Sequence, residues 1–137
     1  AAIVAHRVYP NALLKLLQFI MHGYLTMALE TVEQLKGKCP THIFLQAGVG
    51  SMAGAMCGFF ASLYGPDVPV ISIVEPKTAD CVYRTAEKDD GKLHNAPGSL
   101  ETIMAGLSCG EPCNVGWKEI RAQFCIFLGK LILRTCY

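Results

Sequence analysis

A glycine-rich segment, residues 46–54 (QAGVGSMAG), is the part of this sequence best suited to bind an anion. It follows a short apolar run at residues 42–46 and precedes residues 51–64, which contain no proline, so it is expected to connect a strand to a helix. The first backbone N–H groups of a helix have no partner within the helix, and the helix dipole adds positive charge there. Glycine permits positive φ and lets an anion approach the backbone closely. The segment is therefore predicted to hold a phosphate group.

Two kinds of phosphate ligand remain open from these residues. Gly48-x-Gly50-x-x-Ala53 matches a relaxed dinucleotide-binding fingerprint. Glu75 ends the next predicted strand, about where an acid that binds the ribose would lie. This combination is the argument for a domain that binds a nicotinamide dinucleotide. The alternative is the phosphate of another cofactor, such as pyridoxal phosphate.

Two further interpretations need no phosphate. Residues 41–65 contain no Asp, Glu, Lys or Arg, and Gly50, Gly54 and Gly58 repeat at the G-x-x-x-G spacing of membrane helices. Gln46, the glycine turn and the strand that follows count against a membrane span. The last interpretation is that the glycines only allow close packing. For Gly54 and Gly58, packing of a helix on the sheet is the preferred explanation.

The predicted elements around the glycine turn indicate an α/β fold. A strand, a glycine turn, a helix and a second strand form a βαβ unit, which implies a parallel sheet with helices on its faces, in a three-layer αβα arrangement. Helices are expected at residues 12–35, 51–64, 78–84 and 116–127 and from Ser99 onward, strands at 42–46 and 68–74, and a polar surface loop at 88–99.

Composition excludes several classes of protein. Of the 137 residues, 52% are apolar and 17% are charged, which rules out a disordered chain or a coiled coil. The net charge of +1 gives no electrostatic argument for nucleic acid or an anionic membrane as a partner. Seven cysteines is an odd number, and Arg7 interrupts the first apolar run where a signal peptide would need continuity. The cysteines are therefore expected to be reduced thiols in the cytoplasm.

The residues predict neither a metal site nor a catalytic nucleophile. Cys109 and Cys113 are spaced C-x-x-x-C, with no second pair and no nearby histidine, which is weak evidence for zinc. Gly50-Ser51 lacks the G-x-S-x-G frame of a serine nucleophile. No side chain is assigned a catalytic role.

Four ordered blocks of the sequence resemble the diaminopropionate ammonia-lyase family. Together with Trp117 they cover about residues 20–121, most of the chain. The blocks are MHGY at 21–24, PTHIFLQAGVGSMAG at 40–54, VEPKTADCVYR at 74–84 and TIMAGLSCGEP at 102–112. The resemblance strongly favours pyridoxal phosphate over a dinucleotide.

The resemblance implies part of a fold-type-II pyridoxal-phosphate enzyme of the tryptophan synthase β-like superfamily. Such a lyase converts the amino acid 2,3-diaminopropionate to pyruvate and ammonia, and an intact member is compatible with a homodimer. The backbone that would hold the cofactor phosphate is that of Ala47, Gly48, Val49, Gly50, Ser51 and Met52. The segment that would lie near the cofactor ring is Met104, Ala105 and Gly106.

Some family features are missing from the sequence. None of the eight lysines lies in a motif like that of the Schiff-base lysine, so the chain alone is expected to be inactive. In related enzymes the acid corresponding to Glu75 helps to hold a divalent cation together with a later Asp. Cys81 stands at that later position, and a thiol is a poor ligand for Mg²⁺ or Ca²⁺, so no such site is predicted. Residues 1–17 and 124–137 differ from the family, and residues 1–137 are interpreted as one fragment of its cofactor-binding catalytic domain.

Overall fold

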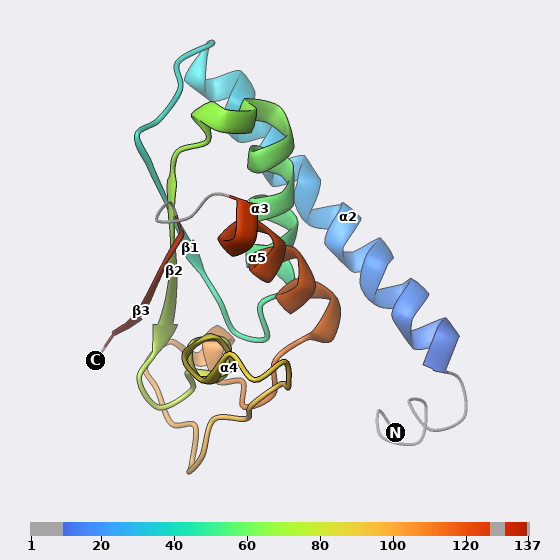
Figure 1. Ribbon diagram of the computed structural model, residues 1–137, viewed down its shortest axis with the longest axis vertical. Coiled ribbons are helices and arrows are strands. Elements are labelled where there is room, and N and C mark those ends of the chain that lie inside the picture. Colours follow the sequence, from blue (N-terminus) through green and yellow to red (C-terminus); the bar gives the residue numbers. More distant parts are fainter. Residues whose placement is uncertain (1–9, 127–130, 137) are drawn as a thin grey trace.

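The computed structural model describes residues 10–126 and 131–136 (Figure 1). Its elements follow the order helix, strand, helix, strand, helix, helix, strand, with two short 3₁₀ helices between them. They are α2 (Pro10–Leu35), β1 (His42–Gln46), α3 (Ser51–Tyr64), η1 (Gly65–Asp67), β2 (Val70–Pro76), α4 (Cys81–Lys88), η2 (Ala105–Leu107), α5 (Asn114–Ile126) and β3 (Leu131–Cys136).

The three strands form one parallel sheet in the order β1-β2-β3. β1 has the predicted bounds. β2 begins two residues later than predicted, since Pro69 has no N–H group and the Val70 N–H is the first to pair, with the Thr41 carbonyl at 3.1 Å. β3 was not predicted. It pairs with β2 from Ile71 to Pro76, and so extends the sheet on the side away from β1.

Helices α2, α3 and α5 lie on the same side of the sheet (Figure 1). The core between these layers contains Leu45 and Ile73 from the sheet, Phe60 from α3 and Ile120 from α5, all 5% exposed or less. On the other face of β1, Phe44 is 70% exposed. The α/β class with a parallel sheet is confirmed, and the residues described here form the sheet and the helical layer on one of its faces.

Two glycines allow α3 and α5 to pack unusually closely. A Cβ atom on Gly54 would lie 2.5 Å from the Gly116 carbonyl oxygen, closer than such contacts occur. A Cβ atom on Gly58 would lie 3.2 Å from Oε2 of Glu119, also on α5. The packing explanation for Gly54 and Gly58 is supported, although their neighbour is α5 and not the sheet as predicted.

The helix predicted to begin at Ser99 is wrong. Only the short η2 forms in this region. Gly98 and Leu100 have positive φ angles of 94° and 59°, which a right-handed helix cannot accommodate. The hydroxyl of Thr102 accepts the Met104 N–H at 3.1 Å, a local turn that competes with helix formation.

α3 has the predicted bounds, and the other predicted helices, α2, α4 and α5, are present with shifted bounds. α4 begins three residues later than predicted, because the Ala79 N–H first closes a turn onto the Pro76 carbonyl at 2.9 Å. The predicted polar loop at 88–99 has no regular structure after Lys88. No helix in the described ranges is long and apolar enough to cross a membrane. The sequence differences noted at both ends include residues 1–9, 127–130 and 137, which lie outside the described residues.

Candidate phosphate-binding site

The glycine segment turns sharply between β1 and α3. Gly50 caps the N-terminus of α3 with φ 88° and ψ 0°, a left-handed conformation that favours glycine. A Cβ atom there would also lie 3.0 Å from Cγ2 of Val82. Both the backbone angle and the limited space therefore favour glycine at this position.

A cavity of about 230 Å³ lies beside this turn. Residues 47–52, called the phosphate loop from here on, all line it. Of the three residues predicted near the cofactor ring, Gly106 lines the cavity, whereas Met104 and Ala105 do not. The complete lining is Tyr24, Gln46, Ala47, Gly48, Val49, Gly50, Ser51, Met52, Ala53, Gly106, Leu107 and Cys109.

The backbone of the loop offers donors to this cavity. Within the described part of the chain, the N–H groups of residues 48–53 donate to no protein acceptor, and the first helical hydrogen bond runs from Gly54 to the Gly50 carbonyl at 2.9 Å. The first turn of α3 contains no acidic residue, and no side chain caps it. The positive end of the helix dipole is thus not neutralised by the described residues, which suits a phosphate group.

The carbonyl groups of the loop are held by the protein. The Val49 carbonyl accepts the Cys113 N–H at 2.7 Å, and the Gly48 carbonyl accepts the Cys81 thiol at 3.4 Å. The Ala47 N–H donates to Val74 on the neighbouring strand at 2.9 Å. These contacts from three separate segments fix the loop in a conformation in which Ala47 is paired with the sheet and the N–H groups of residues 48–52 are not paired with the protein.

Five residues that line the cavity were not among the predicted site residues: Tyr24, Gln46, Ala53, Leu107 and Cys109. From the sequence, Tyr24 belongs only to the block at residues 21–24, and Cys109 was considered only as half of a weak zinc pair. A Cβ atom on Gly48 would lie 3.0 Å from Sγ of Cys109, so the Cys109 side chain packs directly on the loop. Both residues fall within blocks that carry the family resemblance, and that was the signal available for finding them.

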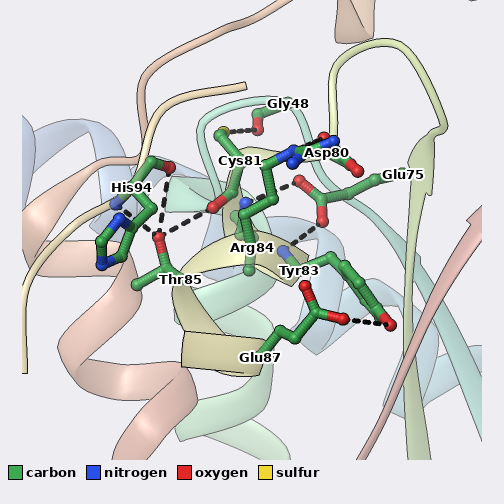
Figure 2. A network of polar contacts seen from close by, with 10 residues as sticks. Gly48, Glu75, Asp80, Cys81, Tyr83, Arg84, Thr85, Glu87 and His94 are labelled. Carbon is green, nitrogen blue, oxygen red and sulfur yellow. Dashed lines mark hydrogen bonds and ion pairs between the residues drawn. The ribbon is translucent and has the colours of Figure 1, made fainter. Parts of the chain in front are cut away.

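Glu75 does not have the orientation that a dinucleotide site requires. Its side chain is 1% exposed, and its two carboxylate oxygens accept the N–H groups of Val82 at 2.9 Å and Tyr83 at 2.7 Å, at the start of α4 (Figure 2). Burial raises the pKa of Glu75 to about 7, although these two hydrogen bonds act in the opposite direction. Because Glu75 is buried and both of its oxygens face the start of α4, its carboxylate is not accessible to a ribose, and the dinucleotide alternative is not supported.

A polar network surrounds Glu75 and α4 (Figure 2). Asp80 pairs with Arg84, and the Thr85 hydroxyl bonds the backbone of His94, accepting its N–H at 2.9 Å. Burial raises the pKa of the Cys81 thiol to about 12, so the thiol stays protonated and can donate to Gly48. No group of three His, Cys, Asp or Glu side chains in the described ranges is arranged to hold a metal ion.

The described lysines lie away from the cavity. Seven of the eight lysines fall in the described ranges, and none of these seven lines the cavity. The described part of the chain therefore supplies groups for holding a phosphate but no amine beside them.

Comparison with known proteins identifies the class. The sequence model of the family described as "Pyridoxal-phosphate dependent enzyme" matches residues 5–125, a range that includes the segment 20–121 and extends beyond it on both sides. The chain belongs to this family of pyridoxal-phosphate-dependent enzymes.

Similar relatives are diaminopropionate ammonia-lyases. The chain is 46% identical over 113 residues to that of Salmonella typhimurium and 49% identical over 109 residues to that of Escherichia coli K12, which covers 80% and 78% of the chain. It spans only 28% and 27% of those relatives, or about a quarter of their length.

Solved structures agree with this class. The E. coli diaminopropionate ammonia-lyase, in complex with an aminoacrylate-pyridoxal phosphate azomethine reaction intermediate, matches with a TM-score of 0.65 and 48% identity over 74% of this chain and 25% of that one. A threonine deaminase from T.th. matches with a TM-score of 0.69 but 19% identity, over 85% of this chain and 40% of that one, and supports the fold alone.

Proposed function

We propose that this chain forms the phosphate-binding part of a pyridoxal phosphate site. The phosphate loop would bind the cofactor phosphate through its backbone, and Met104, Ala105 and Gly106 would lie toward the cofactor ring. The observation that carries the proposal is a set of unpaired N–H groups at the start of α3, on residues that line a cavity of about 230 Å³. The match of the family model over most of the chain supports the identity of the cofactor.

The residues around the cavity would each have a limited task. The loop N–H groups would donate to the phosphate oxygens, as they do at other helix N-termini that bind anions. The side chains of Tyr24, which is half-buried, and of Leu107 and Cys109 also line the cavity and would cover the bound group and exclude water. When bound, pyridoxal phosphate supplies the electron sink that stabilises a carbanion.

The reaction we propose for the protein is that of an ammonia-lyase acting on 2,3-diaminopropionate. The curated relatives of that name match across about four fifths of the chain, which supports this assignment. We further propose an amino-acid substrate, a homodimer and a cytoplasmic location. The free thiols of Cys39, Cys57, Cys81, Cys109 and Cys113 agree with a reducing compartment.

Elimination with pyridoxal phosphate requires a lysine amine to bind the cofactor and to move the substrate proton. None of the described lysines lines the cavity. We therefore propose that the chain binds the cofactor through its phosphate and does not release pyruvate from 2,3-diaminopropionate by itself.

Equilibrium binding of pyridoxal phosphate and of pyridoxal to the purified chain tests the cofactor assignment. We expect pyridoxal phosphate to bind at least about tenfold more tightly, since pyridoxal cannot use the loop N–H groups. Equal affinities, or no binding of either compound, would overturn it. A pyruvate assay with 2,3-diaminopropionate on the same sample tests the second part, and measurable pyruvate would contradict it.

A further inference from the structure

Glu75 is a buried carboxylate that joins the end of β2 to the start of α4. Val82 and Tyr83, whose N–H groups it accepts, are the second and third residues of α4 and lack acceptors within the helix. Asp80, at the N-cap position, makes no capping hydrogen bond and pairs instead with Arg84. Glu75 therefore caps the N-terminus of α4 in place of Asp80.

The same first turn of α4 lies against the phosphate loop. The Cys81 thiol donates to the Gly48 carbonyl at 3.4 Å, as Figure 2 shows. Val82 packs on Gly50 so closely that a Cβ atom there would lie 3.0 Å from its Cγ2. Cys81 and Val82 are 0% and 1% exposed, so a displacement of this turn must be transmitted to the loop.

The contacts form a closed ring. Gln46, the last residue of β1, pairs with Val74 on β2, and the next residue along β2 is Glu75. From Glu75 the ring passes through the first turn of α4 to Gly48, and from there back along the chain to Gln46. The carboxylate is the polar link between the sheet and α4 in this ring.

We propose that Glu75 is a positioning residue, which holds the first turn of α4 against Gly48 and Gly50 and so keeps the N–H groups of the phosphate loop directed at the cavity. This inference rests on the function proposed above. Glu75 lies outside the cavity lining, so it acts through Val82 and Tyr83 and does not touch the ligand.

The substitution Glu75→Gln separates this role from simple space filling. Glutamine has nearly the same shape, but only its oxygen can accept an N–H group, and its NH₂ group would face the second donor. It also avoids burying a charge, so the effect on stability is expected to be smaller than the loss of a hydrogen bond alone would suggest.

Thr85→Val is the matched control. Thr85 is also on α4 and is 1% exposed, and its hydroxyl bonds the Cys81 carbonyl at 2.8 Å and the His94 N–H at 2.9 Å. Valine keeps the shape and removes these bonds. This variant disturbs the side of α4 that faces His94, and leaves the two N–H bonds of Glu75 in place.

Three measurements on the full 137-residue chain are compared for both variants: thermal unfolding, affinity for pyridoxal phosphate, and the ¹⁵N–¹H NMR signals of Gly48 and Gly50 without ligand. We expect Glu75→Gln to lower the affinity about tenfold and to shift both glycine signals. Thr85→Val should leave the affinity within about twofold, even where it lowers the unfolding temperature more.

Unchanged glycine signals in Glu75→Gln, or equal losses of affinity in the two variants, would overturn the positioning role. If the unsubstituted chain binds no pyridoxal phosphate, the proposed function fails. The glycine signals of the ligand-free variants still decide on the positioning role in that case, so the two failures are distinguishable.

Discussion

The two helix N-termini beside the phosphate loop are built in opposite ways. The start of α4 receives a buried carboxylate, Glu75, which accepts two of its N–H groups. The start of α3 receives no side-chain cap and has no acid in its first turn, and its N–H groups open onto a cavity of about 230 Å³. Within one small fold, the protein places a carboxylate at the start of one helix, whereas the described residues place none at the start of the other.

An uncapped helix N-terminus is a stronger indication of a bound anion when the protein caps the N-terminus that lies next to it. The Cys81 thiol and the Val82 side chain connect the two, since both belong to α4 and both contact the loop. The capped N-terminus of α4 thus helps to hold the loop at the N-terminus of α3 in place. This comparison can be tested by changing the loop conformation, by titrating the acid that caps α4, by supplying an acid to α3, or by removing the thiol contact between α4 and the loop.

The largest effect is expected from Gly50→Ala. The left-handed conformation costs about 1–2 kcal/mol and the close contact with Val82 adds about 1–3, so we expect stability to fall by about 4 kcal/mol and cofactor binding to be lost. Denaturant unfolding and equilibrium binding measure these changes. Gly91→Ala is the control, because Gly91 has a φ of 78° but no atom near its Cβ position. Equal losses in the two variants would mean that Val82 does not restrict this position.

Titration of Glu75 gives the next largest effect. Its pKa in the folded chain is about 7, above the ordinary value of 4.5, so protonation favours folding. The stabilisation is complete below pH 4.5 and is lost as the pH rises through 7. We expect this group to make the chain about 2–3 kcal/mol more stable at pH 5 than at pH 8. Denaturant unfolding of the chain and of Glu75→Gln at both pH values isolates the contribution, and parallel pH profiles would contradict it.

Supplying an acid to α3 should make it resemble α4. Val49 lines the cavity and is 37% exposed, so Val49→Asp places a carboxylate just before the α3 N-cap. We expect affinity for pyridoxal phosphate to fall about tenfold, or about 1.4 kcal/mol, through repulsion of the phosphate. Val49→Asn has the same shape without the charge and should bind nearly as the unsubstituted chain does. Equal affinities of the Asp and Asn variants would place the phosphate elsewhere.

The smallest effect is expected from Cys81→Ala, which removes the weak thiol hydrogen bond to Gly48. We expect a loss of about 1 kcal/mol in stability and of about twofold in cofactor affinity. Cys57→Ala provides the comparison, because Cys57 is equally buried but lies on α3 away from the cavity lining. A loss of affinity in the Cys57 variant as large as that in the Cys81 variant would indicate a general effect of core packing.

Local sequence was enough to predict the glycine turn between β1 and α3. Gly48, Gly50 and the small residues after them lie between an apolar run and a region without proline, and the turn, the helix start and the unpaired N–H groups follow from neighbours in the chain. β1 and α3 have the predicted bounds for the same reason.

The residues that hold the loop and complete the cavity come from segments far apart in the sequence, so they could not be predicted from the neighbours of the loop in the chain. Glu75 was considered as a ribose ligand, since nothing in its neighbourhood shows that its carboxylate turns back onto α4. Tyr24 and Cys109 come to the cavity from segments more than twenty residues away in either direction. The helix expected from Ser99 onward does not form, because Leu100 has a positive φ angle and the Thr102 hydroxyl accepts the Met104 N–H in a local turn.

The central claim is that the open N-terminus of α3 holds the phosphate of pyridoxal phosphate. A ¹⁵N–¹H NMR titration of the chain with pyridoxal phosphate, and separately with pyridoxal, tests it most directly. The account predicts that the amide signals of Gly48, Gly50 and Ala53 shift with pyridoxal phosphate and not with pyridoxal, while those of Val82 and Tyr83 move little. Binding of pyridoxal phosphate that leaves the three loop signals unchanged would contradict it.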